Sequence, residues 1–154
     1  MSREAAIRLL GVLGATIGIP DLQLDEAGCC ALAFDEVVVN LEADPDGRQL
    51  FLYANVGPVP SSDSSELYKQ LLDGNLFWKD TGGATLGLDR EGGRVVLLQS
   101  LPAERISDPE FAAAVEQFVN AAEAWTRRIA EAAAEPPPAG DAQTPFVILP
   151  SMLA

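Results

Sequence analysis

The sequence predicts an α+β domain, in which a twisted antiparallel sheet of about five strands has its helices packed on one face. Three observations carry this prediction. Helical apolar spacing occurs at both ends of residues 3–134, short alternating runs fill the middle, and turn residues join those runs into hairpins. With 154 residues, 48% of them hydrophobic and 21% charged, the chain is long and apolar enough to bury one core.

The N-terminal element is a predicted helix over residues 3–17, where apolar side chains recur at helical spacing and a proline follows. Gly11, Gly14 and Gly18 weaken it but would let another backbone approach closely. A basic start before an apolar run is also typical of a signal peptide. The acidic Glu4 and the lack of a clear A-x-A cleavage site favour a structural helix, and the run is too short to span a bilayer.

Three short strands are predicted next, over residues 31–34, 37–42 and 49–56. Asp-Glu after the first strand and Asp-Pro-Asp-Gly after the second are typical of tight turns, so the three strands should form a meander. The first strand begins this meander. It should therefore be an edge of the sheet, with backbone groups that no neighbouring strand satisfies.

The second half continues with a helix over about 64–75, strands over 84–90 and 94–101, and a long helix from 108 to about 134. Glu-Gly-Gly joins the two strands into a hairpin, and the predicted order is α-β-β-β-α-β-β-α. Residues 95–98 are apolar on both faces, which predicts a central strand covered on both sides by helices or by another subunit.

Residues 135–154 are predicted to be a Pro-rich tail with an apolar end, following a domain of residues 1–134. The run EPPPAG cannot continue a helix, because proline lacks an amide donor and clashes with the preceding turn. The apolar residues 146–153 come after it. They either fray, as termini commonly do, or form an apolar plug that docks on the domain's own exposed groove.

The acidic charge balance limits the classes of partner. Ten Lys and Arg residues against 23 Asp and Glu residues give a net charge of −13. Nucleic acid and anionic membranes are bound through Lys and Arg, so neither nucleic-acid binding nor membrane insertion is expected. A basic or amphipathic partner fits this surface better.

Nothing in the sequence predicts an enzyme, a metal site or a cofactor. There is no histidine, which removes the commonest general base and the commonest transition-metal ligand. The carboxylates within 35–36 and 89–91 fall in predicted turns, and the glycine pairs lack the Lys and Ser/Thr of a phosphate loop. The adjacent Cys29 and Cys30 are expected to be free thiols in a reducing bacterial cytoplasm.

Several motifs together resemble the CesT (Tir chaperone) family of type III secretion chaperones. The matching segments are NLFW at 75–78, TGGATLGLD at 81–89, VVLLQSLP at 95–102, and a final helix with Phe118 and AEAW at 122–125. The resemblance covers roughly residues 3–134 and departs in the Pro-rich tail. It implies a homodimer of small acidic cytoplasmic subunits. Each would bind the non-globular N-terminal segment of a secreted effector and keep it export-competent without nucleotide hydrolysis.

Two apolar groups are the candidate binding surfaces, although ordinary core is the competing interpretation of each member. A groove beside the first strand would bind the effector through Leu9, Val12, Leu13, Leu22, Leu24, Leu32, Phe34 and Val38. A dimer interface would use Leu67, Leu71, Leu76, Phe77, Trp78, Leu86, Leu88, Val96 and Leu98. The alternative function is an α+β regulatory or adaptor domain that binds a folded partner or a small ligand.

Overall fold

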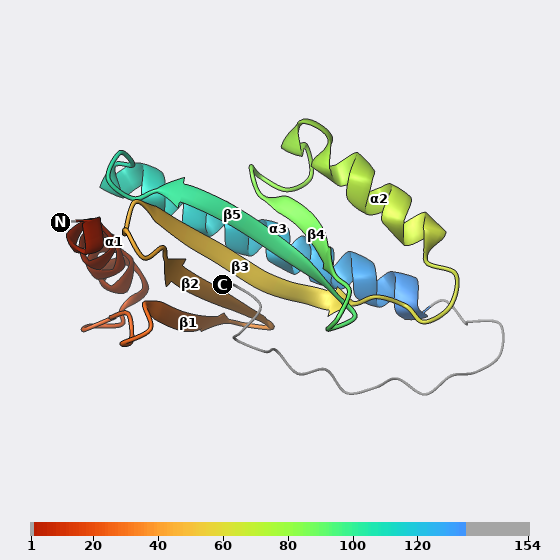
Figure 1. Ribbon diagram of the computed structural model, residues 1–154. Coiled ribbons are helices and arrows are strands. Elements are labelled where there is room, and N and C mark those ends of the chain that lie inside the picture. The colour runs from red at the N-terminus through yellow and green to blue at the C-terminus, as the bar shows by residue number, and fades with distance from the viewer. Residues whose placement is uncertain (1, 135–154) are drawn as a thin grey trace.

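The computed structural model describes residues 2–134, which form a five-stranded antiparallel sheet with its helices on one face (Figure 1). The predicted fold class and element order are confirmed. The elements are α1 (Ser2–Ile17), β1 (Cys29–Phe34), β2 (Val37–Ala43), β3 (Gln49–Pro58), α2 (Ser65–Asn75), the short 3₁₀ helix η1 (Leu76–Trp78), β4 (Thr85–Asp89), β5 (Arg94–Pro102) and α3 (Asp108–Ala134). The tail at 135–154 and its expected plug lie outside the described residues.

The strand order in the sheet is β1-β2-β3-β5-β4, with all neighbours antiparallel. The predicted meander and hairpin are therefore both present, and the pairing of β3 with β5 joins them. β1 is an edge strand, as the sequence predicts, and β4 is the opposite edge.

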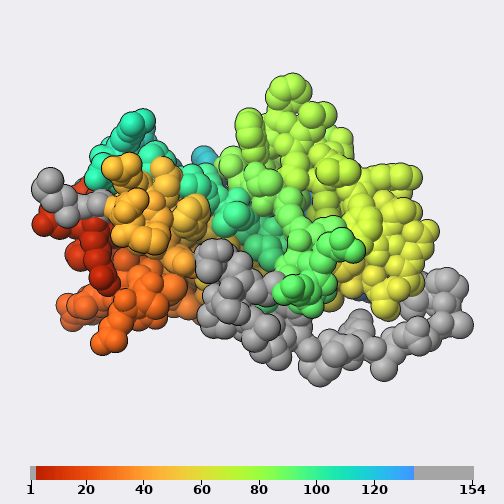
Figure 2. Space-filling model, viewed as in Figure 1, coloured from red at the N-terminus to blue at the C-terminus, as the bar shows by residue number. Residues whose placement is uncertain are grey.

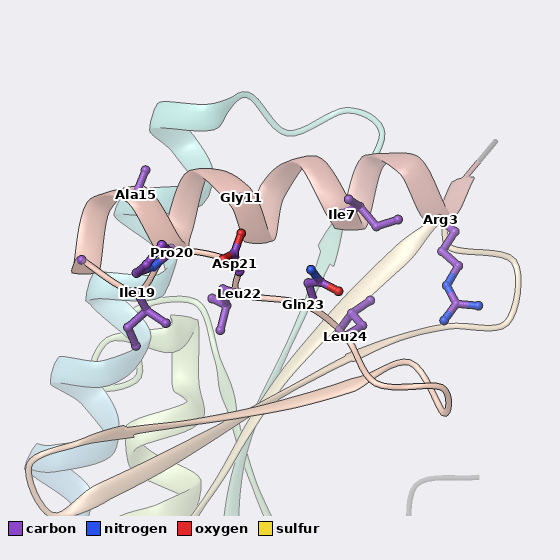
Figure 3. A pocket seen from close by; sticks show the side chains of 12 residues that line it. Arg3, Ile7, Gly11, Ala15, Ile19, Pro20, Asp21, Leu22, Gln23 and Leu24 are labelled. Atoms are coloured by element: carbon purple, nitrogen blue, oxygen red, sulfur yellow. The ribbon is translucent and has the colours of Figure 1, made fainter.

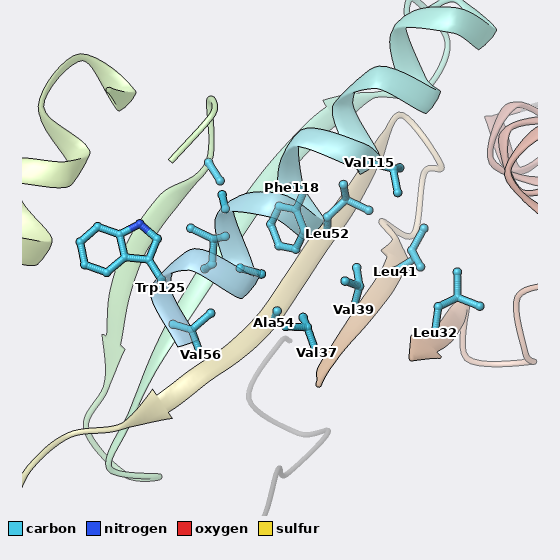
Figure 4. Close-up of a cluster of buried hydrophobic side chains, with 14 of the residues drawn as sticks. Leu32, Val37, Val39, Leu41, Leu52, Ala54, Val56, Val115, Phe118 and Trp125 are labelled. Carbon is cyan, nitrogen blue, oxygen red and sulfur yellow. The ribbon is translucent and has the colours of Figure 1, made fainter. Parts of the chain in front are cut away.

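The core lies between the sheet and α3, which crosses behind it in Figure 1. β3 alternates strictly, with Leu50, Leu52, Ala54 and Val56 buried and the residues between them half-buried. From α3, Phe111, Phe118, Trp125 and Ile129 pack against the core and are fully buried. Figure 4 labels Phe118 and Trp125 among them. Burial of such large side chains contributes about 1.5–3 kcal/mol each.

The ends of α3 are fixed by specific contacts. At its start, the Ser107 hydroxyl accepts a hydrogen bond from the Glu110 backbone N–H at 3.4 Å, and the Ser107 N–H donates to the Glu110 carboxylate at 2.9 Å. This is a capping box. These bonds from Ser107, led by its hydroxyl, hold the pKa of Glu110 below its usual value. Near its other end, Ile129 packs against Gly57, where a Cβ would lie 2.6 Å from Ile129 Cγ2.

The opposite face of the sheet is not covered by any helix of residues 2–134, and Figures 1 and 2 are viewed from this side. On β5, Val96 is half-buried and Leu98 is 40% exposed. β5 is a central strand, as the sequence predicts. No helix of residues 2–134 covers this face, so cover by another subunit stays a prediction. The Tyr53 hydroxyl also lies on this face; burial, with help from Glu42, raises its pKa to about 12.

Within residues 2–134, no helix combines the length and the apolar character needed to cross a membrane.

Gly74 offers a test of the packing between α2 and α3. A Cβ at Gly74 would lie 2.5 Å from Cζ2 of the buried Trp125, whose indole N–H donates to the Asp80 carbonyl at 2.9 Å. Because this ring is fixed, we expect Gly74→Ala to lower the free energy of unfolding by about 1–3 kcal/mol. Urea denaturation measures the change. Gly87→Ala on β4 is the control, since a Cβ there meets nothing within 4 Å; equal stabilities of the two variants would contradict the packing.

Candidate functional site

A groove of about 760 Å³ runs along the outer side of α1 (Figure 3). One wall is the outer face of α1 and the other is the segment 18–24, which turns back beside the helix. The walls are mostly apolar or small, with Arg3 at one end. The residues lining the groove include Ile7, Gly11, Gly14, Ala15, Gly18, Ile19, Leu22 and Leu24. This composition suits an extended apolar segment rather than a charged small ligand.

Two glycines of α1 shape the groove in opposite ways. At Gly14 a Cβ would lie 2.6 Å from the Ile19 carbonyl oxygen, so only glycine lets the segment 18–24 return this closely. The Ile19 N–H also donates to the Gly14 carbonyl at 2.9 Å, after Gly18 turns the chain with a φ of +75°. At Gly11, by contrast, a Cβ would meet nothing within 4 Å. Gly11 therefore forms an open part of the groove floor.

The groove continues toward the outer edge of β1. A second hollow of about 460 Å³ shares Gln23 and Leu24 with the groove and reaches Cys30 and Ala31. At the start of β1 the edge is already satisfied, because Asp25 accepts the Cys29 N–H at 2.9 Å and donates its own N–H to the Cys29 carbonyl at 2.8 Å. Beyond that point, no hydrogen bond within residues 2–134 engages the outward-facing backbone of β1.

The side chains at this site are suited to binding and not to nucleophilic attack. Burial raises the pKa of the Cys30 thiol, and the nearby Asp25 carboxylate adds a smaller increase. Burial also raises the pKa of the Cys29 thiol, with a smaller contribution from Glu42. Both thiols are therefore protonated and weakly reactive near neutral pH. Across the described residues, no cluster of three or more metal-binding side chains occurs.

The carboxylates that the sequence places in turns lie at strand ends and turns: Asp89 is the last residue of β4, and Asp35 lies in the β1–β2 turn. The Asp89 carboxylate accepts the Gly92 N–H at 3.0 Å and forms an ion pair with Arg94 at 2.5 Å. Asp35 is exposed in the β1–β2 turn with a φ of 49°. Neither carboxylate lines the groove.

The structure distributes the predicted groove residues among four environments. Leu22 and Leu24 line the groove. Leu9, Leu13 and Leu32 are buried in the core, and Val12 and Phe34 are half-buried (Figure 4 shows Leu32). Val38 is 45% exposed but lies on the open face of the sheet, since β2 buries its neighbours Val37 and Val39.

Sequence reasoning missed two groove residues, Ile7 and Ile19, which are 56% and 42% exposed. Ile7 shares the helical apolar spacing of α1, but the buried side of the helix consists of Ala6, Leu9, Leu10 and Leu13. The spacing of Gly11, Gly14 and Gly18 could have predicted the groove, because these glycines leave one face of the helix without side chains.

A second exposed apolar surface lies on α2 and η1, and we call it the α2 patch. It consists of Tyr68, Leu72, Leu76, Phe77 and Trp78. Phe77 is 86% exposed, and both Phe77 and Trp78 have positive φ, at 54° and 52°. Such backbone strain costs roughly 1–3 kcal/mol per residue and persists only where the surrounding structure holds it; strained residues cluster at functional sites. Phe77 and Trp78 are thus exposed to solvent, on the region of α2 and η1 that projects beside β4 (Figure 2).

The predicted dimer-interface residues divide into exposed, half-buried and buried positions. Leu76, Phe77 and Trp78 are exposed in the α2 patch, and Leu88 at the β4 edge and Leu98 are also exposed. Val96 is half-buried beside Leu98 on the open face. Leu67, Leu71 and Leu86 are instead buried within the chain's own core. Tyr68 and Leu72 were not in the predicted interface, although they share the helical spacing of Leu76.

The sequence matches a known family over most of the described residues. Residues 8–126 match the Tir chaperone protein (CesT) family. A protein of Chlamydia pneumoniae is 40% identical over 106 residues, which cover 68% of this chain and 79% of that protein. The transcriptional anti-antiactivator ExsC of Pseudomonas aeruginosa is 31% identical over 121 residues, covering 78% of this chain and 82% of ExsC.

Solved structures show the same fold. A chain in the crystal structure of the ExsC–ExsE complex superimposes with a TM-score of 0.67 at 29% identity, covering 82% of this chain and 94% of that one. A chain of the HopA1–SchA chaperone–effector complex gives a TM-score of 0.63 at 24% identity, covering 82% and 94%. The Yersinia pestis type III secretion chaperone SycH, bound to a fragment of YscM2, gives 0.61 at 23% identity, covering 77% and 98%.

The two glycines of α1 predict opposite effects of one added methyl group. Gly11→Ala should raise the free energy of unfolding by about 0.5–1 kcal/mol, because alanine favours a helix and the site is open. Gly14→Ala should lower it by about 1–3 kcal/mol, because the new Cβ meets the backbone of Ile19. Thermal or urea unfolding of the two variants provides the test, and a stable Gly14→Ala would refute the described wall.

Proposed function

This chain belongs to the Tir chaperone protein (CesT) family, and we propose that it binds the non-globular N-terminal segment of a secreted effector along the α1 groove and the outer edge of β1. It is an effector-binding chaperone of type III secretion. Binding holds the effector segment extended and export-competent in the bacterial cytoplasm. No step requires nucleotide hydrolysis or a cofactor, and we assign the chain no enzymatic activity.

The observation that carries this proposal is the adjacency of an apolar groove and an unpaired strand edge. A strand edge can pair with the backbone of any extended segment, whatever its sequence. The groove beside it then selects apolar side chains at intervals along the segment. Relatives support this reading, because ExsC is present in a complex with ExsE and SchA in a chaperone–effector complex with HopA1.

The acidic charge of the chain fits the same role. A chain with a net charge of −13 attracts a basic segment before contact. The mutual repulsion of such chains also opposes non-specific aggregation through the apolar groove and the α2 patch. The charge contributes to the rate of association, while the apolar groove and the β1 edge contribute to affinity.

The chaperone acts as a homodimer in this proposal, with the α2 patch as its interface. A cluster of five exposed large apolar residues that includes two strained aromatics is typical of a surface that a partner covers. The patch lies beside β4, whereas the groove lies beside β1 at the other side of the sheet. Pairing through the patch therefore leaves both grooves accessible.

A second candidate function is regulatory, and the relationship to ExsC favours it. ExsC, 31% identical to this chain, is named a transcriptional anti-antiactivator, a name that refers to action against an antiactivator. In this chain the same groove would bind an antiactivator protein. Purification of the tagged chain from its native host, with identification of the bound proteins, distinguishes an effector from a regulator.

Filling the groove should weaken client binding without unfolding the chaperone. Gly11→Leu places a side chain in open groove space, and we expect the client affinity to fall by tenfold or more, about 1.4 kcal/mol. The client segment is first identified by co-expression with candidate secreted proteins and limited proteolysis, and its affinity is then measured by calorimetry. Ala113→Leu, on the exposed side of α3, is the matched control. A variant that is folded and binds normally would exclude the groove as the client site.

Introducing a charge into the α2 patch should separate the dimer. We expect a mass of twice 16.3 kDa for the native chain and a single-chain mass for Phe77→Asp, measured by light scattering at micromolar concentration. Loss of one central aromatic commonly weakens an interface by about 2 kcal/mol or more, and a buried charge adds to this. Val38→Asp, at an exposed apolar residue outside the patch, should remain dimeric. A native mass of one chain would reject the interface.

A further inference from the structure

We propose that residues 146–149 of this chain, Phe-Val-Ile-Leu, add to the outer edge of β1 as a short strand and so compete with the client for it. The tail would then cover the edge until a client displaces it. The competition rests on the proposed function, whereas the pairing of the tail with β1 stands independently of any client.

The backbone geometry of β1 sets the length of the segment that can be added. Gly28 and Phe34 face β2, since the Gly28 carbonyl accepts the Ala43 N–H at 3.0 Å and Phe34 lies opposite Val37 across a two-residue turn. Alternate residues of a strand point to opposite sides, so the backbone groups of Cys29, Ala31 and Ala33 face outward.

Asp25 already bonds both backbone groups of Cys29. The open stretch of the edge is therefore limited to Ala31 and Ala33. Each of these two residues presents one N–H and one carbonyl, and none of the four groups has a partner within residues 2–134. Their side chains are small and exposed, so an incoming strand meets no bulky group beside them.

Residues 146–149 match this short edge in length and chemistry. A four-residue strand turns two residues toward its neighbour, which equals the number that β1 leaves open. Pro145 and Pro150 bound the segment, and since proline cannot donate to a ladder, they stop the pairing from extending further. The segment carries no charge, so the acidic surface near Asp25 does not repel it, and its two β-branched residues favour a strand.

The tail is long enough to reach β1. Ile129 of α3 packs against Gly57, so α3 ends near the Gly57 end of β3. Asn40 lies opposite Tyr53 in antiparallel pairing, which places the β1–β2 turn toward that same end of the sheet. β1 is two strand spacings from β3, about 10 Å. A Pro-rich segment of the length of residues 135–145 reaches at most roughly 34 Å, at about 3.1 Å per residue if fully extended. This reach exceeds the distance from the end of α3 to β1.

Amide hydrogen exchange at Ala31 and Ala33 tests the pairing without any client. In the full chain we expect both amides to exchange at least tenfold more slowly than in the double variant Val147→Pro, Ile148→Pro. Adjacent residues of a strand point to opposite sides, so one of these two substitutions removes a donor to β1 in either register. The amide of Leu32 is the internal reference, because it bonds to β2 and should stay protected throughout.

Two further measurements complete the test. Ala139→Pro, in the spacer, should leave the exchange unchanged, and a synthetic peptide of residues 143–152 added to the double variant should restore protection. Equal exchange of Ala31 and Ala33 in the full chain and the double variant would overturn the proposal. Protection that rises with protein concentration would assign the tail to a second copy and also overturn it.

The client experiment then separates the two proposals. If the tail protects the edge tenfold, the double variant should bind the client about tenfold more tightly than the full chain, because the competent fraction rises by that factor. Protection by the tail with no client bound by either protein would reject the proposed function alone. Unprotected Ala31 and Ala33 with normal client binding would reject the tail alone.

Discussion

The pairing of β3 with β5 is the constraint on which the rest of the molecule depends. It runs from Gln49 opposite Pro102 to Pro58 opposite Arg94, across a stretch of sequence that includes α2 and β4. Closing so long a loop costs conformational entropy, which the burial of α3 against the joined sheet offsets. The same pairing sets β1 and β4 at opposite edges, and so separates the surface proposed for the client from the surface proposed for the second subunit.

Local patterns were sufficient to predict the elements and their order. Alternation in β2 and β3, turn residues between strands and the apolar stripe of α3 depend on neighbours in sequence, and each was confirmed. The joining of the two hairpins was not predicted, because the apolar run at 95–98 fits any central strand. The run predicted cover on both faces by helices or by another subunit. The second face of β5 is open within residues 2–134, which leaves cover by another subunit as the prediction.

The candidate site was harder to predict than the fold, because core and groove use the same side chains. Leu9 and Leu13 on α1 are apolar at helical spacing, and so is Ile7, yet only Ile7 reaches the groove. The choice between these faces depends on where α3 and the segment 18–24 lie, which is tertiary information. Leu22 and Leu24 were placed correctly in the groove because they lie outside any regular element and still carry large apolar groups.

Because the space above Gly11 is empty, the shape of the groove can change at this point without a loss of folding stability. In most binding clefts the floor is made of core side chains, so altering its shape also alters folding stability. Here the floor at this point is bare main chain of a helix whose other face carries the core. Replacement by alanine, serine or a larger residue would make the cleft shallower by steps while leaving that core intact. Relatives that recognise different cargo could therefore diverge at this one position at little thermodynamic cost.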